Sequence, residues 1–373
     1  MGISVNPIVR PVIFEDAAAV KDLHCRAGYS GELRDSWPGL WTNNPLWAKT
    51  DPKPIIGWVL EAAGEIVGYL GNIPLLCRYG EKTLVAAAAS GFAVDPAYRG
   101  YGLLLAAAFY KQKDVDILLN TSANEIVAKV CQRFKAAPLP QQNYDQILFW
   151  VLKPQPFMAA ALRKLRFNST LAWVGSNLSA ILLRVDIILR SKRPRRKNSG
   201  SQAPWVVSPI SASEIGQEFD DLWDRKASEE TRLFTYRTAE FLRWHYYGQM
   251  AKVICCHKGA DLVGYAVLIR DETQSFGLAR SRIVDILAEK NDPNVVGQLL
   301  EAAYQHARDQ GSHVLEVMGF PQDIRSMILR NGPYSRMAPN LPYYYRALDS
   351  ELQSELGNED VWYACPFDGD ASL

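Results

Sequence analysis

The sequence predicts an α+β protein of two domains, each a mixed, mostly antiparallel sheet flanked by helices. Two domains are expected because 373 residues exceed what one ordinary hydrophobic core organises. Apolar runs separated by short turns predict antiparallel hairpins in the first half. The order of predicted elements in the first half is three strands, a helix, a strand, a helix and a strand. The same order recurs in the second half, which predicts a duplicated fold.

Hydrophobic periodicity predicts the elements of the first domain in order. Apolar runs predict strands at residues 8–13, 56–62, 66–78, 84–94, 115–120 and 146–151. Helical spacing of apolar residues predicts helices at residues 16–26, 100–111 and 122–134. The turns at residues 62–64 and 79–82 are short enough for hairpins. These elements make up a first domain at residues 1–154.

A helical and then basic segment, residues 155–203, separates the two domains. Apolar spacing predicts helix through residues 155–190, and the basic run Arg190 to Lys197 followed by Asn-Ser-Gly-Ser is a linker by composition. The second domain, at residues 204–373, has predicted helices at residues 211–226, 238–247 and 293–309. Its predicted strands are at residues 253–257, 262–270, 280–288, 313–317 and 343–348.

Composition and charge argue against several classes of function. The formal net charge of +1 gives no general attraction to nucleic acid, which is therefore not an expected partner. The six cysteines form no Cys-x-x-Cys pair and no secretory leader precedes them, which predicts reduced thiols and a cytoplasmic location. Asn177, Arg184 and Asp186 interrupt the most apolar window, which argues against a membrane span. The five histidines have no metal-binding spacing, so no metal is expected.

A short stretch around Arg99 carries the chemical signal in this sequence. A strand ends at Val94, Pro96 removes a backbone donor, and Gly100 and Gly102 lead into an apolar-periodic helix. Unpaired backbone N–H groups at a helix N-terminus, together with the helix dipole, bind phosphates. Arg99 adds a full positive charge, so the stretch predicts a pyrophosphate site. The alternative is an ordinary glycine turn between a strand and a helix.

The stretch resembles the acyl-CoA-binding motif of the GNAT (GCN5-related N-acetyltransferase) superfamily, Val-x-Pro-x-x-Arg-Gly-x-Gly followed by a small residue. Five motif positions match from Val94 through Gly102, whereas Leu104 replaces the small residue and either narrows the phosphate approach or packs inward. The resemblance implies tandem GNAT-like domains and acetyl-CoA, or another acyl-CoA, as co-substrate. Phe92, Ala93 and Val94 are implied to pair with the pantetheine arm through a strand bulge. The other residues implied to contact the cofactor are Arg99, Gly100, Tyr101, Gly102, Leu103, Leu104 and Asn124.

The sequence also contains candidate catalytic residues. Members of the family often carry a general-acid Tyr four residues before a Gly-Phe pair, but here Cys131 stands there and is expected to be a core thiol. Glu61 is a candidate base, and Tyr144, Tyr101 and Cys131 are candidate acids. Each has a structural alternative, because direct attack by an amine with a water-relayed proton needs no dedicated residue. Asn124 has the alternative of bonding locally in the first turn of a helix.

Three tryptophans in the long loop of the first domain, Trp37, Trp41 and Trp47, are candidates for the acceptor site. Flat aromatic faces suit sugars, aromatic amines and polyamines; alternatively, these residues hold the loop together. In the second domain, residues 288–294 contain acidic side chains and no glycine at the place of the phosphate turn. This domain is therefore expected to be degenerate, and it either binds the acceptor or is structural. Three stretches, residues 241–247, 282–286 and 362–370, resemble tandem GNAT proteins associated with surface-polysaccharide biosynthesis.

The resemblance predicts an acyltransferase, an acetyl-CoA-dependent N-acetyltransferase that acts on a small-molecule amine, with an amino sugar of surface polysaccharide as the preferred acceptor. The alternatives are a broad amine or aminoglycoside acetyltransferase, a transferase that uses aminoacyl-tRNA, and a non-catalytic acyl-CoA-binding sensor. The basic run Arg190 to Lys197 is either a solvated linker or a peripheral contact with anionic lipid or nucleic acid.

Overall fold

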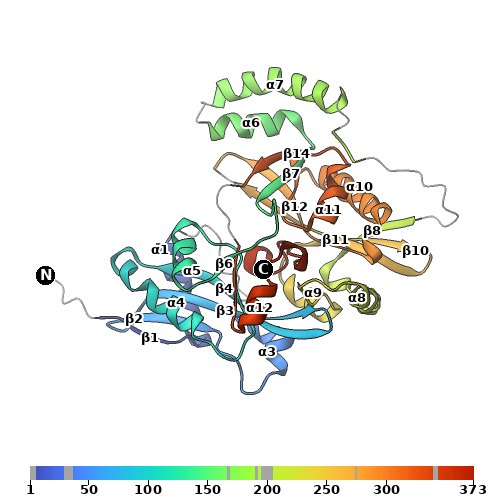
Figure 1. Ribbon diagram of the computed structural model, residues 1–373. Coiled ribbons are helices and arrows are strands. Elements are labelled where there is room, and N and C mark those ends of the chain that lie inside the picture. The colour runs from blue at the N-terminus through green and yellow to red at the C-terminus, as the bar shows by residue number, and fades with distance from the viewer. Residues whose placement is uncertain are drawn as a thin grey trace. The chain divides into compact units, whose positions relative to one another are not determined.

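The computed structural model describes residues 6–28, 37–165, 169–189, 192–194, 205–273, 275–338 and 343–373. Tertiary contacts divide the chain into two compact units, each with a sheet of its own (Figure 1). Unit 1 contains residues 1–141, 231–248 and 340–373, and unit 2 contains residues 142–230 and 249–339. The units interleave along the chain, whereas the sequence predicts contiguous domains. No helix within the described ranges is long and apolar enough to cross a bilayer.

Unit 1 contains a mixed sheet with one parallel strand pair. In spatial order the strands are β1 (Ile8–Pro11), β2 (Gly57–Ala62), β3 (Glu65–Tyr79), β4 (Lys82–Val94), β5 (Ile117–Asn120), β15 (Tyr344–Ala347) and β6 (Ala137–Pro138), and β9 (Phe234–Thr235) also pairs with β3. β4 and β5 are parallel, and the other described neighbours are antiparallel. Ala63 and Gly64 both have positive φ, which allows the tight turn predicted between β2 and β3.

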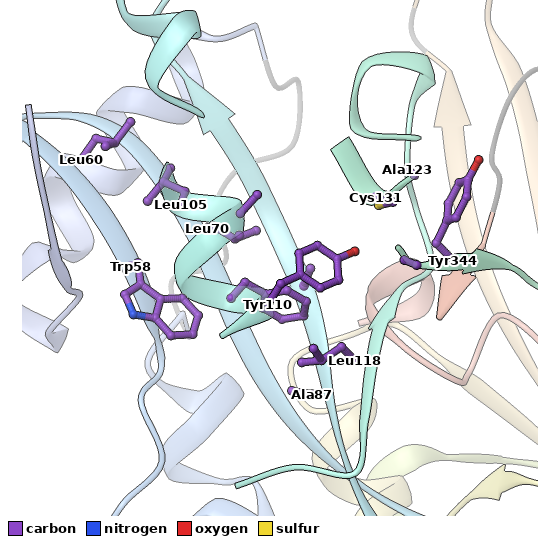
Figure 2. Packing of buried hydrophobic residues seen from close by; sticks show 14 of the residues in the cluster. Trp58, Leu60, Leu70, Ala87, Leu105, Tyr110, Leu118, Ala123, Cys131 and Tyr344 are labelled. Atoms are coloured by element: carbon purple, nitrogen blue, oxygen red, sulfur yellow. The ribbon is translucent and has the colours of Figure 1, made fainter. Parts of the chain in front are cut away.

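The helices of unit 1 pack on this sheet to form its apolar core. They are α1 (Ala17–Arg26), α2 (Gly39–Thr42), α3 (Pro45–Lys49), α4 (Gly102–Tyr110), α5 (Glu125–Arg133), α9 (Ala239–His245) and α12 (Ser350–Glu355), with 3₁₀ turns that include η2 (Pro96–Tyr101) and η6 (Asp370–Ser372). Figure 2 shows Leu105 and Tyr110 of α4 packed among Trp58 of β2, Leu70 of β3 and Leu118 of β5. Burying each large apolar side chain stabilises the fold by about 1.5–3 kcal/mol. This packing fixes α4 on the sheet, with its N-terminus close to the end of β4.

Unit 2 contains a second mixed sheet. In spatial order its strands are β8 (Trp205–Ser211), β10 (Lys252–Lys258), β11 (Asp261–Thr273), β12 (Leu278–Ala288), β13 (Val314–Val317), β7 (Gln146–Val151) and β14 (Tyr334–Met337). β12 and β13 are parallel, and the other described neighbours are antiparallel. The helices are α6 (Pro154–Lys164), α7 (Ser169–Leu189), α8 (Gln217–Glu229), α10 (Pro293–Asp309) and α11 (Gln322–Leu329). Val296, Leu299 and Ala303 of α10 are fully buried against this sheet.

Both sheets have the same strand order, which confirms the predicted α+β fold with two similar units. In each sheet the fourth and fifth strands are parallel, and the sixth strand comes from the other half of the chain. The sequence predicts β7 in the first sheet, but it lies in the second, between β13 and β14. It predicts β15 in the second sheet, but it lies in the first, between β5 and β6. These placements were wrong because an apolar pattern marks a strand without identifying its partners.

Candidate functional site

β4 and β5 part toward their carboxyl ends and leave one edge of β4 without a strand partner. Their parallel pairing joins residues 86–88 to residues 117–119, whereas β4 continues to Val94. From Ala89 to Val94, the described strands pair with β4 on its β3 side alone. No described strand covers the other edge of β4 beyond Ala88, and backbone groups at such a strand edge can pair with a ligand.

A bulge in β4 shapes this open edge. The register shifts between Tyr69 and Gly71 of β3, so that β4 carries one extra residue here. Gly91, in the bulge, has a φ of +62°, and its carbonyl oxygen accepts a 2.8 Å hydrogen bond from Nε2 of His24. Burial lowers the pKa of His24, against the opposing effect of this hydrogen bond. The bulge lies where the family resemblance implies one, and contact of residues 92–94 with pantetheine stays a prediction.

The predicted phosphate turn directly follows this strand. η2 holds Arg99 and Gly100 on the surface, and α4 begins at Gly102. Apart from its neighbours in the chain, no residue has an atom within 4 Å of the place that a Cβ on Gly100 would take, whereas a Cβ on Gly102 would lie 3.4 Å from the ring of Phe92. Arg99 forms no ion pair or hydrogen bond with any described residue. An exposed, unpaired cation beside the N–H groups of a helix terminus suits a phosphate.

The other predicted cofactor residues take different positions around this turn. Leu103 and Leu104 are 46% and 45% exposed, so Leu104 does not pack inward. Tyr101 donates its hydroxyl to Oδ1 of Asn6 at 2.9 Å. Asn124 caps α5, because its Oδ1 accepts two backbone N–H groups of the first turn, each at 3.0 Å. The structure thus shows the local bonding of Asn124, and its contact with the cofactor stays a prediction.

Two of the candidate catalytic residues in unit 1 have structural roles, one in an ion pair and one in the core. Glu61 of β2 accepts a 2.6 Å hydrogen bond from Nε of Arg10, with which it forms an ion pair. Cys131 is 1% exposed within the core, and burial raises the pKa of its thiol. Cys131 is therefore a core residue. Tyr144 belongs to unit 2, where its carbonyl oxygen accepts the backbone N–H of Gly319 at 3.0 Å.

Asp370 lies at the end of β5. The sequence points to it only as the last residue of the stretch 362–370, which resembles tandem GNAT proteins. Its two carboxylate oxygens accept hydrogen bonds from the hydroxyls of Thr121 and Ser122, at 2.7 and 2.9 Å. These hydroxyls directly follow β5, where β4 and β5 part, and η6 packs against β4. Burial raises the pKa of Asp370 above the ordinary value of an aspartate, against the opposing effect of the two hydroxyls. A carboxylate with a raised pKa at this position is a candidate general base.

The segment that leads to this carboxylate is fixed by a buried ion pair. Nη2 of Arg237, which is fully buried, lies 3.4 Å from Oδ1 of Asp368. Thr235 of β9 donates both its hydroxyl and its backbone N–H to the same carboxylate oxygen. Gly369 has a φ of +155°, and a Cβ there would overlap the side chain of Thr121. Only glycine lets the segment pass this close to the end of β5.

The three tryptophans pack into unit 1. Trp37 and Trp41 are 4% and 1% exposed, and their ring centroids lie 4.9 Å apart. The indole Nε1 of Trp41 donates to the carbonyl oxygen of Asn72 at 2.8 Å, and that of Trp47 donates to a loop carbonyl at 3.0 Å. This geometry favours the alternative that they hold the loop together. An acceptor role for these residues stays a prediction, and partly exposed Trp47 has the most surface to offer.

The corresponding turn of unit 2 is filled by its own side chains. Lys290 and Asn291, in the turn after β12, have φ values of 52° and 47° although neither is glycine. Asn291 Oδ1 accepts a 2.8 Å hydrogen bond from Nζ of Lys226. Asp292 caps α10 by accepting the backbone N–H of Asn294 at 2.8 Å. A pyrophosphate would meet an occupied helix terminus and acidic side chains here, in contrast to the turn at Arg99.

Solved structures of N-acyltransferases share this fold. A GCN5-related N-acetyltransferase from Anabaena variabilis ATCC 29413 matches with a TM-score of 0.54 at 11% identity, over 92% of this chain and 73% of that chain. A GCN5-related N-acetyltransferase from Kribbella flavida matches at 0.54 and 12% identity, over 93% and 72%. Saccharomyces cerevisiae N-myristoyltransferase with bound myristoyl-CoA matches at 0.52 and 11% identity, over 93% and 81%. These likenesses establish the GNAT fold of this chain.

No protein-family model matches the sequence, and no curated protein matches it significantly. The function therefore rests on the geometry of the site and on the shared fold.

Proposed function

We propose that this GNAT-fold protein is an acyl-CoA-dependent acyltransferase that binds its co-substrate between the diverging ends of β4 and β5. One arrangement carries the proposal. The edge of β4 that no described strand covers leads directly into the turn of Arg99, Gly100 and Gly102 at the N-terminus of α4. The edge can pair with the amide groups of the pantetheine arm, and the turn can bind the pyrophosphate. The acetyltransferase and N-myristoyltransferase neighbours support an acyl-CoA as co-substrate.

The finer assignment is an N-acetyltransferase that transfers an acetyl group to a small-molecule amine, with an amino sugar as the preferred acceptor. The neighbours include enzymes named for acetyl and for myristoyl transfer, so the fold accommodates short and long acyl groups. Unit 2 is proposed to bind the acceptor or to be structural. Thiol release measured with acetyl-CoA and with longer acyl-CoAs, across a panel of amines, identifies both the donor and the acceptor.

Asp370 is proposed to start the reaction as the general base. Its carboxylate removes a proton from the acceptor ammonium, and the free nitrogen attacks the thioester carbon. The backbone N–H groups on the open edge of β4 stabilise the oxyanion that forms. The C–S bond then breaks, and the CoA thiolate takes a second proton from the nitrogen. The proton on Asp370 passes to solvent, which restores the carboxylate.

We expect Arg99→Ala to weaken CoA binding by about ten- to a hundredfold, because a lost charge-assisted contact costs about 1.5–3 kcal/mol. Isothermal titration calorimetry with CoA measures the change. Arg133→Ala is the matched control, since Arg133 is an exposed arginine at the far end of α5. Unchanged affinity in Arg99→Ala would contradict the assignment of the turn.

We expect one CoA to bind per chain. The turn at Arg99 is open, whereas the turn at Lys290 and Asn291 is filled by side chains of unit 2. Calorimetry and native mass spectrometry both report the stoichiometry. Two bound CoA molecules, one of which survives Arg99→Ala, would show that unit 2 has a site of its own.

A non-catalytic acyl-CoA sensor is the second candidate function. The observation that favours it is the buried core thiol of Cys131 at the position where the family often has a general-acid Tyr. A sensor binds acetyl-CoA without releasing thiol in the presence of any amine of the panel. Turnover that depends on an amine supports the enzyme instead.

A further inference from the structure

Two helices of unit 2 form a hairpin beside its sheet, with α7 the more distant of the two (Figure 1). Gln155 of α6 donates a 3.2 Å hydrogen bond to Oγ of Ser176 in α7. Asp186 of α7 accepts a 2.5 Å hydrogen bond from the hydroxyl of Tyr334 in edge strand β14. One face of α7 is therefore packed against protein. Ile187, 3% exposed, lies on this face.

The opposite face of α7 is apolar and uncovered. Its exposed side chains, with their exposed fractions, are Ile181 57%, Leu182 74%, Val185 48%, Ile188 67% and Leu189 77%. At 3.6 residues per turn these positions fall within an arc of about 120° on one side of the helix. A continuous apolar patch on the surface of a protein marks a site that binds an apolar partner.

A cationic groove of about 580 Å³ lies beside this face. Lys153, Arg184, Arg193 and Arg308 line it, and no carboxylate is among the lining side chains. None of the four cations forms an ion pair with a described residue. Arg184 belongs to α7, as does Ile188, which lines the groove and also contributes to the apolar face. The groove and the apolar face are therefore continuous.

We propose that this surface of unit 2 docks on an anionic phospholipid bilayer. The apolar face of α7 enters the boundary between headgroups and acyl chains, and the groove cations contact lipid phosphates. Apolar and cationic groups side by side fit a lipid surface, which offers acyl chains and phosphates at adjacent depths. A second copy of this chain would place the same unpaired cations near one another, which electrostatic repulsion opposes.

The sequence carries further positive charge directly after α7. Residues 190–197 contain six lysines and arginines. Lys192 and Arg193 of that run lie within the described residues, and the other four cations lie outside them. Each cation held near an anionic bilayer strengthens attachment by about fivefold. Of the two described cations, Arg193 also lines the groove.

Vesicle co-sedimentation of the full chain tests the proposal. We expect binding to phosphatidylcholine vesicles that contain about one third phosphatidylglycerol, little binding to pure phosphatidylcholine, and release by added salt. The double variant Arg184→Gln, Arg308→Gln should lower the partition constant roughly 25-fold, at about fivefold for each charge. The double variant Leu182→Ser, Leu189→Ser should lower it by about tenfold or more at unchanged salt dependence.

Two control variants separate these effects from general surface changes. Met250→Ser removes an apolar side chain that is 92% exposed elsewhere on unit 2, and Lys82→Gln removes an exposed cation at the start of β4. Both should bind vesicles as the wild type does. Unchanged thermal melting of each variant confirms that the fold is intact.

Three results would overturn the proposal. The first is equal binding to neutral and anionic vesicles. The second is a wild-type dimer in solution that Leu182→Ser, Leu189→Ser converts to a monomer, because a second copy would then cover the face. The third is inorganic pyrophosphate binding that Arg184→Gln, Arg308→Gln abolishes in a protein that does not bind anionic vesicles, because the groove would then serve a soluble anion.

Discussion

Asp370→Asn should lower kcat of acyl transfer by about 10²- to 10⁴-fold, the contribution typical of a positioned general base. The asparagine keeps the size of the side chain and one oxygen acceptor for Thr121 or Ser122, but it cannot take a proton. Because Asp370 lies at the end of β5 and not in the phosphate turn, the affinity for CoA should stay near that of the wild type. Steady-state kinetics and calorimetry measure the two quantities.

The pH dependence provides a second readout for Asp370. The base must be deprotonated to act, so kcat/KM rises as pH increases through its pKa. Burial raises that pKa, so the increase in kcat/KM occurs at a higher pH than for an ordinary aspartate. This increase in kcat/KM with pH, the acidic limb of the profile, should disappear in Asp370→Asn. It should persist in Asp360→Asn, which changes an exposed aspartate of the same unit. A kcat within a few-fold of the wild type, with the limb intact, would assign the base elsewhere.

The strand, turn and helix terminus around Arg99 could be predicted from the sequence because they form within one short stretch. Arg99, Gly100 and Gly102 are neighbours in the chain, and the spacing from Val94 fixes a strand, a turn and a helix terminus in a single stretch. Phosphate binding by the backbone groups at that terminus stays a prediction. No long-range information is needed to place them.

Asp370 could not be predicted in the same way. Its position depends on Thr121, which lies 249 residues earlier, and on the buried pair of Arg237 with Asp368. None of these contacts leaves a periodic pattern or a fixed spacing in the sequence. The same limit explains the misplaced strands, since the partners of β7 and β15 lie far away along the chain. Alternation predicts which residues of a strand are buried, whereas long-range packing decides which sheet receives it.

Trp41→Ala should destabilise unit 1 by about 3–5 kcal/mol, because it removes a large side chain from a packed site and leaves a cavity. Trp41 is 1% exposed, and its indole N–H is bonded to the carbonyl oxygen of Asn72. The side chain of Asn72 in turn exchanges two hydrogen bonds with Gln112, at 2.9 and 3.1 Å, just beyond the end of α4. For a unit of this size the melting temperature should fall by about 10 °C.

The comparison with Trp47 decides between packing and acceptor binding for these residues. Trp47 is partly exposed, so Trp47→Ala should cost less stability than Trp41→Ala. If the tryptophans hold the loop together, the melting temperature falls more for the variant of the more buried tryptophan. The acceptor KM of the folded variants then stays near that of the wild type. If they bind the acceptor, Trp41→Ala raises the acceptor KM at an unchanged melting temperature. The second result would restore the acceptor role that the sequence suggests, because a higher acceptor KM in an equally stable protein indicates a lost contact with the acceptor.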